Sequence, residues 1–146
     1  MRFYKGNGNS GTHVGHLWTS TGTLLGTVSF AGETASGWQT ASFATPIAVS
    51  ANTTYVVSYF DPNGHYALEE DLFDWPLKTA PLTALKASYT DPSGGNGVFN
   101  AGGPGFPTGT FNGSSYAVDV IFDTTQPVTP PVVSGVTPDD GSSGIP

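Results

Sequence analysis

The chain contains no cysteine and few charged residues. Of its 146 residues, 4 are Lys or Arg and 11 are Asp or Glu, so charged residues make up 10% of the composition, against about 25% in an average domain. The absence of cysteine excludes disulfides, thiolate metal sites and cysteine nucleophiles. With a net charge of -7, the chain lacks the cations needed to neutralise a run of phosphates, so we expect no nucleic-acid partner.

Long apolar runs and helical patterns are also missing. No apolar run approaches the roughly 20 residues of a membrane-spanning helix, and the scarcity of cations disfavours an anionic membrane surface. Only residues 69–75 (EEDLFDW) favour a short helical turn, with acids near its start. Met1 leads directly into a strand-like segment without a leader pattern, so we expect the chain to be a piece of a longer protein.

What the sequence has instead is short bursts of alternating polar and apolar residues, separated by turn-forming residues. Their number and spacing predict an all-β fold, an antiparallel β-sandwich or jelly roll. The expected strands are 2–4, 16–18, 23–30, 38–43, 46–49, 53–59 and 116–122. We expect a core made of the strand aromatics Trp18, Trp38, Tyr55, Tyr59, Tyr116 and Phe122.

The composition changes along the chain and predicts three parts. Residues 1–123 are expected to form the β-sandwich module, and residues 124–135 a Pro- and Thr-rich extended linker. Residues 136–146 (VTPDDGSSGIP) are expected to be the truncated start of a following domain. Within the module, loops dominate between residues 60 and 115, and long loops on a rigid sandwich are where function is expected.

The three histidines are the first candidates for chemistry. His13 and His16 are three residues apart, a separation that puts two side chains on opposite faces of a strand. A zinc site built on this pair, with His65 as a third ligand, is therefore not expected. We expect Trp18 to point inward and His16 toward solvent. His13 and His65 each either brace a loop by bonding a backbone carbonyl or line a binding surface.

Carboxylates form the second group of candidates. Five acids lie between residues 61 and 74, and an oxygen-rich loop of this kind is an alternative site for calcium, although adjacent acids are more often a solvated face. Neither a glycosidase pair nor a serine hydrolase motif is recognisable. We therefore expect no enzymatic activity and no required cofactor. The acids are Asp61, Glu69, Glu70, Asp71 and Asp74.

Aromatic residues in the long loops form the third group. Aromatic faces contact the C–H groups of sugars, while neighbouring Asn, Asp or His side chains bond the hydroxyls. The alternative is that Trp75 and Phe106 only plug the loops onto the sandwich. The loop aromatics are Tyr66, Trp75, Phe99 and Phe106. The predicted ligand-binding set is His13, His65, Tyr66, Trp75 and Phe106.

The segments RFYKG, GTHVGHLW, ETASGWQ, TTYVVSY and PNGHY resemble the domain of unknown function 4082 (DUF4082), over about residues 2–122. This resemblance implies a secreted or cell-surface β-sandwich accessory module of large bacterial proteins. The end of the chain resembles the first strand of a bacterial Ig-like domain. Members of the family carry another strand or so before RFYKG, so we expect a missing N-terminal strand or an edge completed from elsewhere. An unpaired edge is a template for strand addition from another chain.

Two functions follow as hypotheses. The first is a non-catalytic accessory module that binds polysaccharide through loops 60–110. The alternative is a structural or adhesive spacer without a small ligand, which forms homo-oligomers through an open sheet edge.

Overall fold

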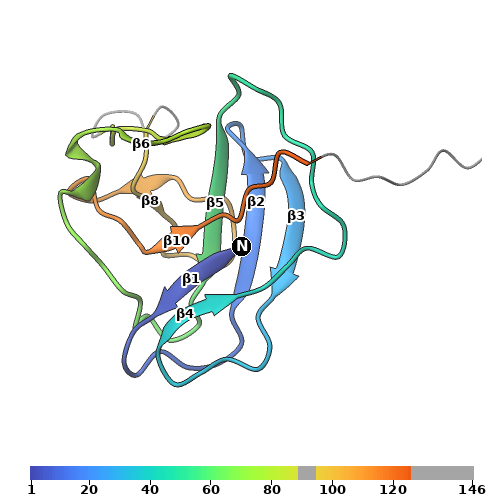
Figure 1. Ribbon diagram of the computed structural model, residues 1–146. Helices are drawn as coiled ribbons and strands as arrows, with labels where there is room; N and C mark the ends of the chain where they lie inside the picture. The colour runs from blue at the N-terminus through green and yellow to red at the C-terminus, as the bar shows by residue number, and fades with distance from the viewer. Residues whose placement is uncertain (89–94, 126–146) are drawn as a thin grey trace, which may run out of the picture.

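The computed structural model describes residues 1–88 and 95–125. Two three-stranded antiparallel sheets lie face to face in it (Figure 1). The first sheet, in the order β10-β1-β4, consists of β1 (Arg2–Lys5), β4 (Gly37–Thr40) and β10 (Val118–Asp119). The second, in the order β3-β2-β5, consists of β2 (Val14–Thr19), β3 (Leu24–Ser29) and β5 (Tyr55–Phe60). The predicted all-β sandwich is confirmed.

Smaller elements lie to one side of the two sheets (Figure 1). They are the hairpin of β6 (Leu77–Thr79) and β7 (Leu82–Ala84), the pair β8 (Val98–Phe99) and β9 (Gly109–Thr110), and the 3-10 helix η1 (Leu72–Asp74). The helix η1 is the short turn expected within residues 69–75. In the described part of the chain, no helix is long and apolar enough to cross a membrane.

Two of the predicted strands differ from the structure. Residues 46–49 do not form a strand, since Pro46 has no N–H to donate and only Ile47 is partly covered. The strand expected at 116–122 is reduced to β10, because Ala117 has a φ of 49° and so interrupts the extended backbone. Residues 126–146, which include most of the predicted linker and the predicted Ig-like start, lie outside the described residues.

The core lies between the two sheets and centres on Phe3, whose side chain is fully buried. Its ring stacks on Tyr59 of the opposite sheet at 4.4 Å between centroids, and meets Phe30 edge-on at 4.7 Å. Strand alternation carries Phe3 and Lys5 inward and Arg2 and Tyr4 outward. The alternation of outward and inward residues in β1 therefore places the Phe3 ring between the sheets, in contact with Phe30 and Tyr59.

Two aromatics expected in the core are exposed instead. Trp38 is 49% exposed and Phe122 is 39% exposed. Trp38 pairs with Tyr4 on the outer face of the first sheet, and the Arg2 guanidinium lies 4.7 Å from the centre of its indole ring. Gln39 takes the inward position in β4 instead, because its register partner is Phe3.

Strand β2 is buried on both of its faces. Gly15 lies against Met1 and Phe30 in the core, whereas His16 and Trp18 lie on the opposite face and are 8% and 7% exposed. The expectation that His16 faces solvent is therefore wrong. Residues two apart on a strand share a face, so His16 is covered together with Trp18, and their rings stack at 5.3 Å.

The strand that contains RFYKG is not an edge. As the middle strand of its sheet, β1 is paired with β10 on one side and with β4 on the other. The edges of the second sheet are β3 and β5. The edges of the first sheet are β10 and β4, so the segment RFYKG is not available for strand addition.

Neighbouring residues of β1 test the sandwich directly. We expect Phe3→Ala to lower the free energy of unfolding by about 3–5 kcal/mol, the usual cost of removing a buried aromatic ring. Tyr4→Ala, on the exposed face of the same strand, is expected to cost about 1 kcal/mol or less. Urea unfolding measures both. Equal losses for the two variants would contradict the alternation assigned to β1.

Candidate functional site

A cleft of about 640 Å³ opens along β5. One wall is made by residues 57–60 of β5 and by the turn that follows it, including Asp61 and Tyr66. The second wall is the segment 98–105 with Pro107. Among the described strands, β5 pairs only with β2, so its other edge has no strand partner there. We call this site the edge cleft.

Three aromatic rings gather at the edge cleft. Tyr66 and Tyr116 meet edge-to-face at 5.6 Å, and Phe99 lies 6.0 Å from Tyr116. Tyr66 is 48% exposed, so part of its ring is available to a ligand. Rings held against one another in this way present an apolar surface without large loss of side-chain freedom.

Polar groups of β2 and β5 lie beside these rings. The indole Nε1 of Trp18 donates a hydrogen bond of 2.9 Å to Ser58 Oγ, and His16, stacked on Trp18, lines the edge cleft. Burial lowers the pKa of His16 from its usual 6.5. The imidazole is therefore neutral at pH 7 and offers hydrogen bonds rather than charge.

The turn after β5 holds Asp61 in one orientation. Its Oδ1 accepts hydrogen bonds from the backbone N–H groups of Asn63 (3.0 Å) and Gly64 (3.1 Å). The Asn63 side chain in turn donates to Gly8 O (3.2 Å) and Ser10 Oγ (2.8 Å). The Asp-Pro-Asn-Gly sequence, which favours this kind of turn, is thereby tied to the loop before β2.

Two buried oxygen atoms of the edge cleft have no partner among the described residues. They are Oδ2 of Asp61 and the hydroxyl of Tyr59. Burial raises the pKa of Tyr59 above its usual range, and so do the charge of Asp61 and, once its phenol ionises, that of Tyr66, so the Tyr59 phenol keeps its proton at pH 7. A buried polar group without a partner costs about 1–3 kcal/mol of stability. The edge cleft contains two of them, on residues two apart in the chain.

Formal charge in the edge cleft comes from one residue. Among the described residues that line it, Asp61 carries the only formal charge at neutral pH, and neither Lys nor Arg is present. In the described ranges 1–88 and 95–125, no group of three or more His, Asp or Glu side chains is arranged to hold a metal ion. The edge cleft can therefore contact a ligand through aromatic rings and through hydrogen bonds.

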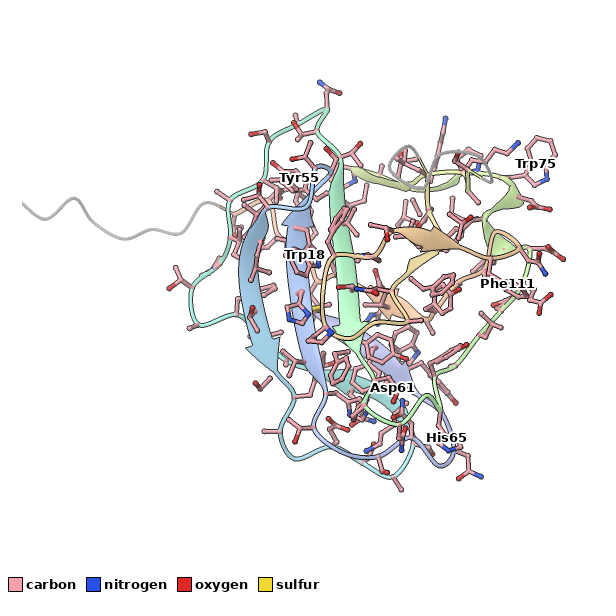
Figure 2. The ribbon with its side chains drawn as sticks, turned by 180° about the vertical axis from the view of Figure 1, so that it is seen from behind. Trp18, Tyr55, Asp61, His65, Trp75 and Phe111 are labelled. Atoms are coloured by element: carbon pink, nitrogen blue, oxygen red, sulfur yellow. The ribbon has the colours of Figure 1, made fainter. Side chains whose placement is uncertain are left out.

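The structure brings only one residue of the predicted ligand-binding set into the edge cleft, Tyr66. His65 is exposed, with its imidazole beside Gly8. Trp75 is 76% exposed with the Lys86 ammonium 5.6 Å from its ring centre, and it lies far from Asp61 and His65 (Figure 2). Phe106 covers Trp18, at 5.7 Å between rings, which is the plugging role considered for it.

His13, the fifth of these residues, is fully buried in a polar network. Its Nδ1 donates to the Glu33 carboxylate at 2.9 Å, which also accepts from Lys5 Nζ at 2.8 Å. Its Nε2 lies 2.6 Å from the side-chain oxygen of Asn9. His13 therefore braces loops through side chains rather than through a backbone carbonyl. As predicted, His13 and His16 lie on opposite faces, since His13 contacts Phe3 in the core.

Sequence reasoning places several cleft residues elsewhere. Tyr116 is predicted in the core and His16 in solvent, but both line the edge cleft. Tyr59 packs in the core as predicted and lines the edge cleft as well. The Asp-Pro-Asn-Gly turn signal directly after a predicted strand was sufficient to place Asp61 at a strand end. Nothing in the sequence indicates which segment covers the outer face of β2, and that segment forms the second wall.

Comparison with known proteins gives a family but no relative with an assigned role. The family model described as Domain of unknown function (DUF4082) matches residues 1–118. Neither a curated protein nor a solved structure matches the chain.

The buried network predicts a pH dependence of stability. Burial alone would raise the pKa of Glu33, but hydrogen bonds and charges from His13 and Lys5 outweigh it and hold that pKa below the usual 4.5. Its contribution to stability is therefore fully present above 4.5 and lost as the pH falls through the lower pKa of the folded state.

We expect Glu33→Gln to lower the free energy of unfolding by about 3–5 kcal/mol at pH 7, because Lys5 loses its buried partner. The difference from the wild type should shrink below pH 4.5. Urea unfolding between pH 3 and pH 7 measures both effects. A difference that stays constant over this range would show that Glu33 does not titrate as described.

Proposed function

This chain belongs to the family of domains of unknown function DUF4082, and we propose that it is a non-catalytic module that binds carbohydrate in the edge cleft. The observation that carries the proposal is the aromatic cluster of Tyr66, Tyr116 and Phe99, in which Tyr66 is exposed, beside hydrogen-bonding groups. The volume of about 640 Å³ is within the range of small-ligand sites.

The chemistry of the edge cleft suits a sugar better than a purely apolar ligand. A pyranose ring has C–H faces that contact aromatic rings and equatorial hydroxyls that need hydrogen bonds. Tyr66 and Phe99 supply the first, and Ser58, Asn100 and Asp61 lie in the same lining and supply the second. A ligand without hydroxyls would leave these polar groups desolvated and unpaired, at a cost in affinity.

A binding role is favoured over hydrolysis. Glycosidases of the usual kind require two carboxyl groups on either side of the scissile bond. The described lining of the edge cleft contains one, Asp61. We place this module in a secreted or cell-surface bacterial protein, where it would hold the parent protein on a polysaccharide.

Aromatic substitutions test the proposal. In affinity electrophoresis and calorimetry against a panel of polysaccharides, at least one polymer should bind. We expect Tyr66→Ala and Phe99→Ala each to weaken this binding by about tenfold, the equivalent of about 1.4 kcal/mol. Trp75→Ala is the matched control, because Trp75 is more exposed but lies outside the lining, and it should bind as the wild type does. Loss of binding in the Trp75 variant alone would contradict the assignment.

A spacer that associates through a strand edge is the second candidate. It is favoured by β3, an edge strand of six residues on which Leu24 and Leu25 are 48% and 38% exposed. An edge of this kind is a template for a second copy.

This second candidate predicts concentration-dependent dimers in analytical ultracentrifugation. Thr27→Pro, which removes a backbone donor from β3, should abolish the dimers if the edge is the interface. A monomer at all concentrations, together with polysaccharide binding, would leave only the first function.

A further inference from the structure

We propose that the edge cleft recognises a hydroxyl of an uncharged sugar through Tyr59 and Asp61, and so selects neutral polysaccharides over acidic ones. This inference rests on the proposed carbohydrate-binding function and names its ligand class. It assigns a specificity role to two residues of the lining.

The observation behind the proposal is the pair of buried oxygens that lack partners in the described part of the chain. Most buried polar groups in folded proteins are hydrogen-bonded. Asp61 Oδ2 and the Tyr59 hydroxyl are both exceptions, and both residues line the same cleft. A ligand that forms hydrogen bonds with both oxygens would account for two such groups in one binding site.

Both groups are held in place before a ligand arrives. The Tyr59 ring stacks on Phe3 at 4.4 Å, and Asp61 is fixed by the two backbone N–H groups that bond its other oxygen. A ligand therefore does not have to order these side chains, which lowers the entropic cost of binding.

The two groups differ in what they bond. An ionised carboxylate only accepts hydrogen bonds, whereas a protonated phenol donates one. A sugar hydroxyl matches both groups, since it donates a hydrogen bond to the Asp61 carboxylate and accepts one from the Tyr59 hydroxyl. A carboxylate or sulfate on the sugar has no proton to donate to Asp61 and would be repelled by its charge.

The wider charge distribution acts in the same direction. No cation lines the described part of the cleft, and the chain has a net charge of -7, so an acidic polymer is disfavoured at the site and at longer range. Uronic-acid and sulfated polymers are therefore expected to bind more weakly than uncharged polymers of similar length.

Two single-atom changes test the proposal. Tyr59→Phe removes the hydroxyl and keeps the ring on Phe3, and Asp61→Asn keeps an oxygen for the turn while replacing the second oxygen by an NH2 group. We expect each variant to weaken binding to the preferred neutral polymer about tenfold. Tyr59→Phe should at the same time melt at the wild-type temperature or higher, because it removes a buried group without a partner. Tyr4→Phe, on the outer face of the other sheet, is the matched control. It should change neither the binding to the neutral polymer nor the melting temperature.

The ligand panel consists of mannan, xylan and β-glucan as neutral probes, and polygalacturonate and alginate as acidic ones. Wild-type binding at least tenfold tighter to a neutral polymer, together with weakened binding in both variants, supports the proposal. Equal binding of acidic polymers, or wild-type affinity in both variants while Tyr66→Ala has lost binding, would overturn this inference and leave the proposed function. No binding to any polymer, or binding that Tyr66→Ala does not weaken, would overturn both.

Discussion

The burial of β2 on both faces is the constraint on which the rest of the structure depends. A strand in a two-layer sandwich usually has one face in the core and one in solvent. Here His16 and Trp18 occupy the second face and are almost fully covered, so a further segment has to lie over them. The segment 98–107 does so, with Phe106 against Trp18. The edge cleft lies between this segment and β5.

A series of hydrogen bonds links the buried network to the edge cleft. Glu33 holds His13, and His13 holds Asn9 in the loop before β2. Asn63 is bonded to the residues on either side of Asn9, through Gly8 O and Ser10 Oγ, and the turn around Asn63 positions Asp61. His13 thus contributes to the cleft as a structural brace, without contacting a ligand. The two histidines of the GTHVGHLW segment therefore lie in different environments, His13 in the buried polar network and His16 at the edge cleft.

The sequence was sufficient to predict the sandwich but not the composition of its binding site. Period-two alternation identified the six-residue strands, because their inward residues meet one core. It failed for Trp38, whose side of β4 was decided by pairing with Tyr4 across the sheet, and for His16, whose face is covered by residues about 90 positions away. The turn at Asp61 can be predicted from its own few residues. The partners of His13 and the second wall of the cleft cannot, because they depend on contacts between residues far apart in the sequence.

Mapping of a ligand onto the backbone tests the central claim most directly. In a ¹H–¹⁵N NMR titration with neutral manno-, xylo- and gluco-oligosaccharides, we predict that the perturbed amides cluster at residues 58–66 and 98–105, with little change at Trp75 or Trp38. Perturbations gathered on the outer face of the first sheet or around Trp75, or none with any of these oligosaccharides, would contradict the account.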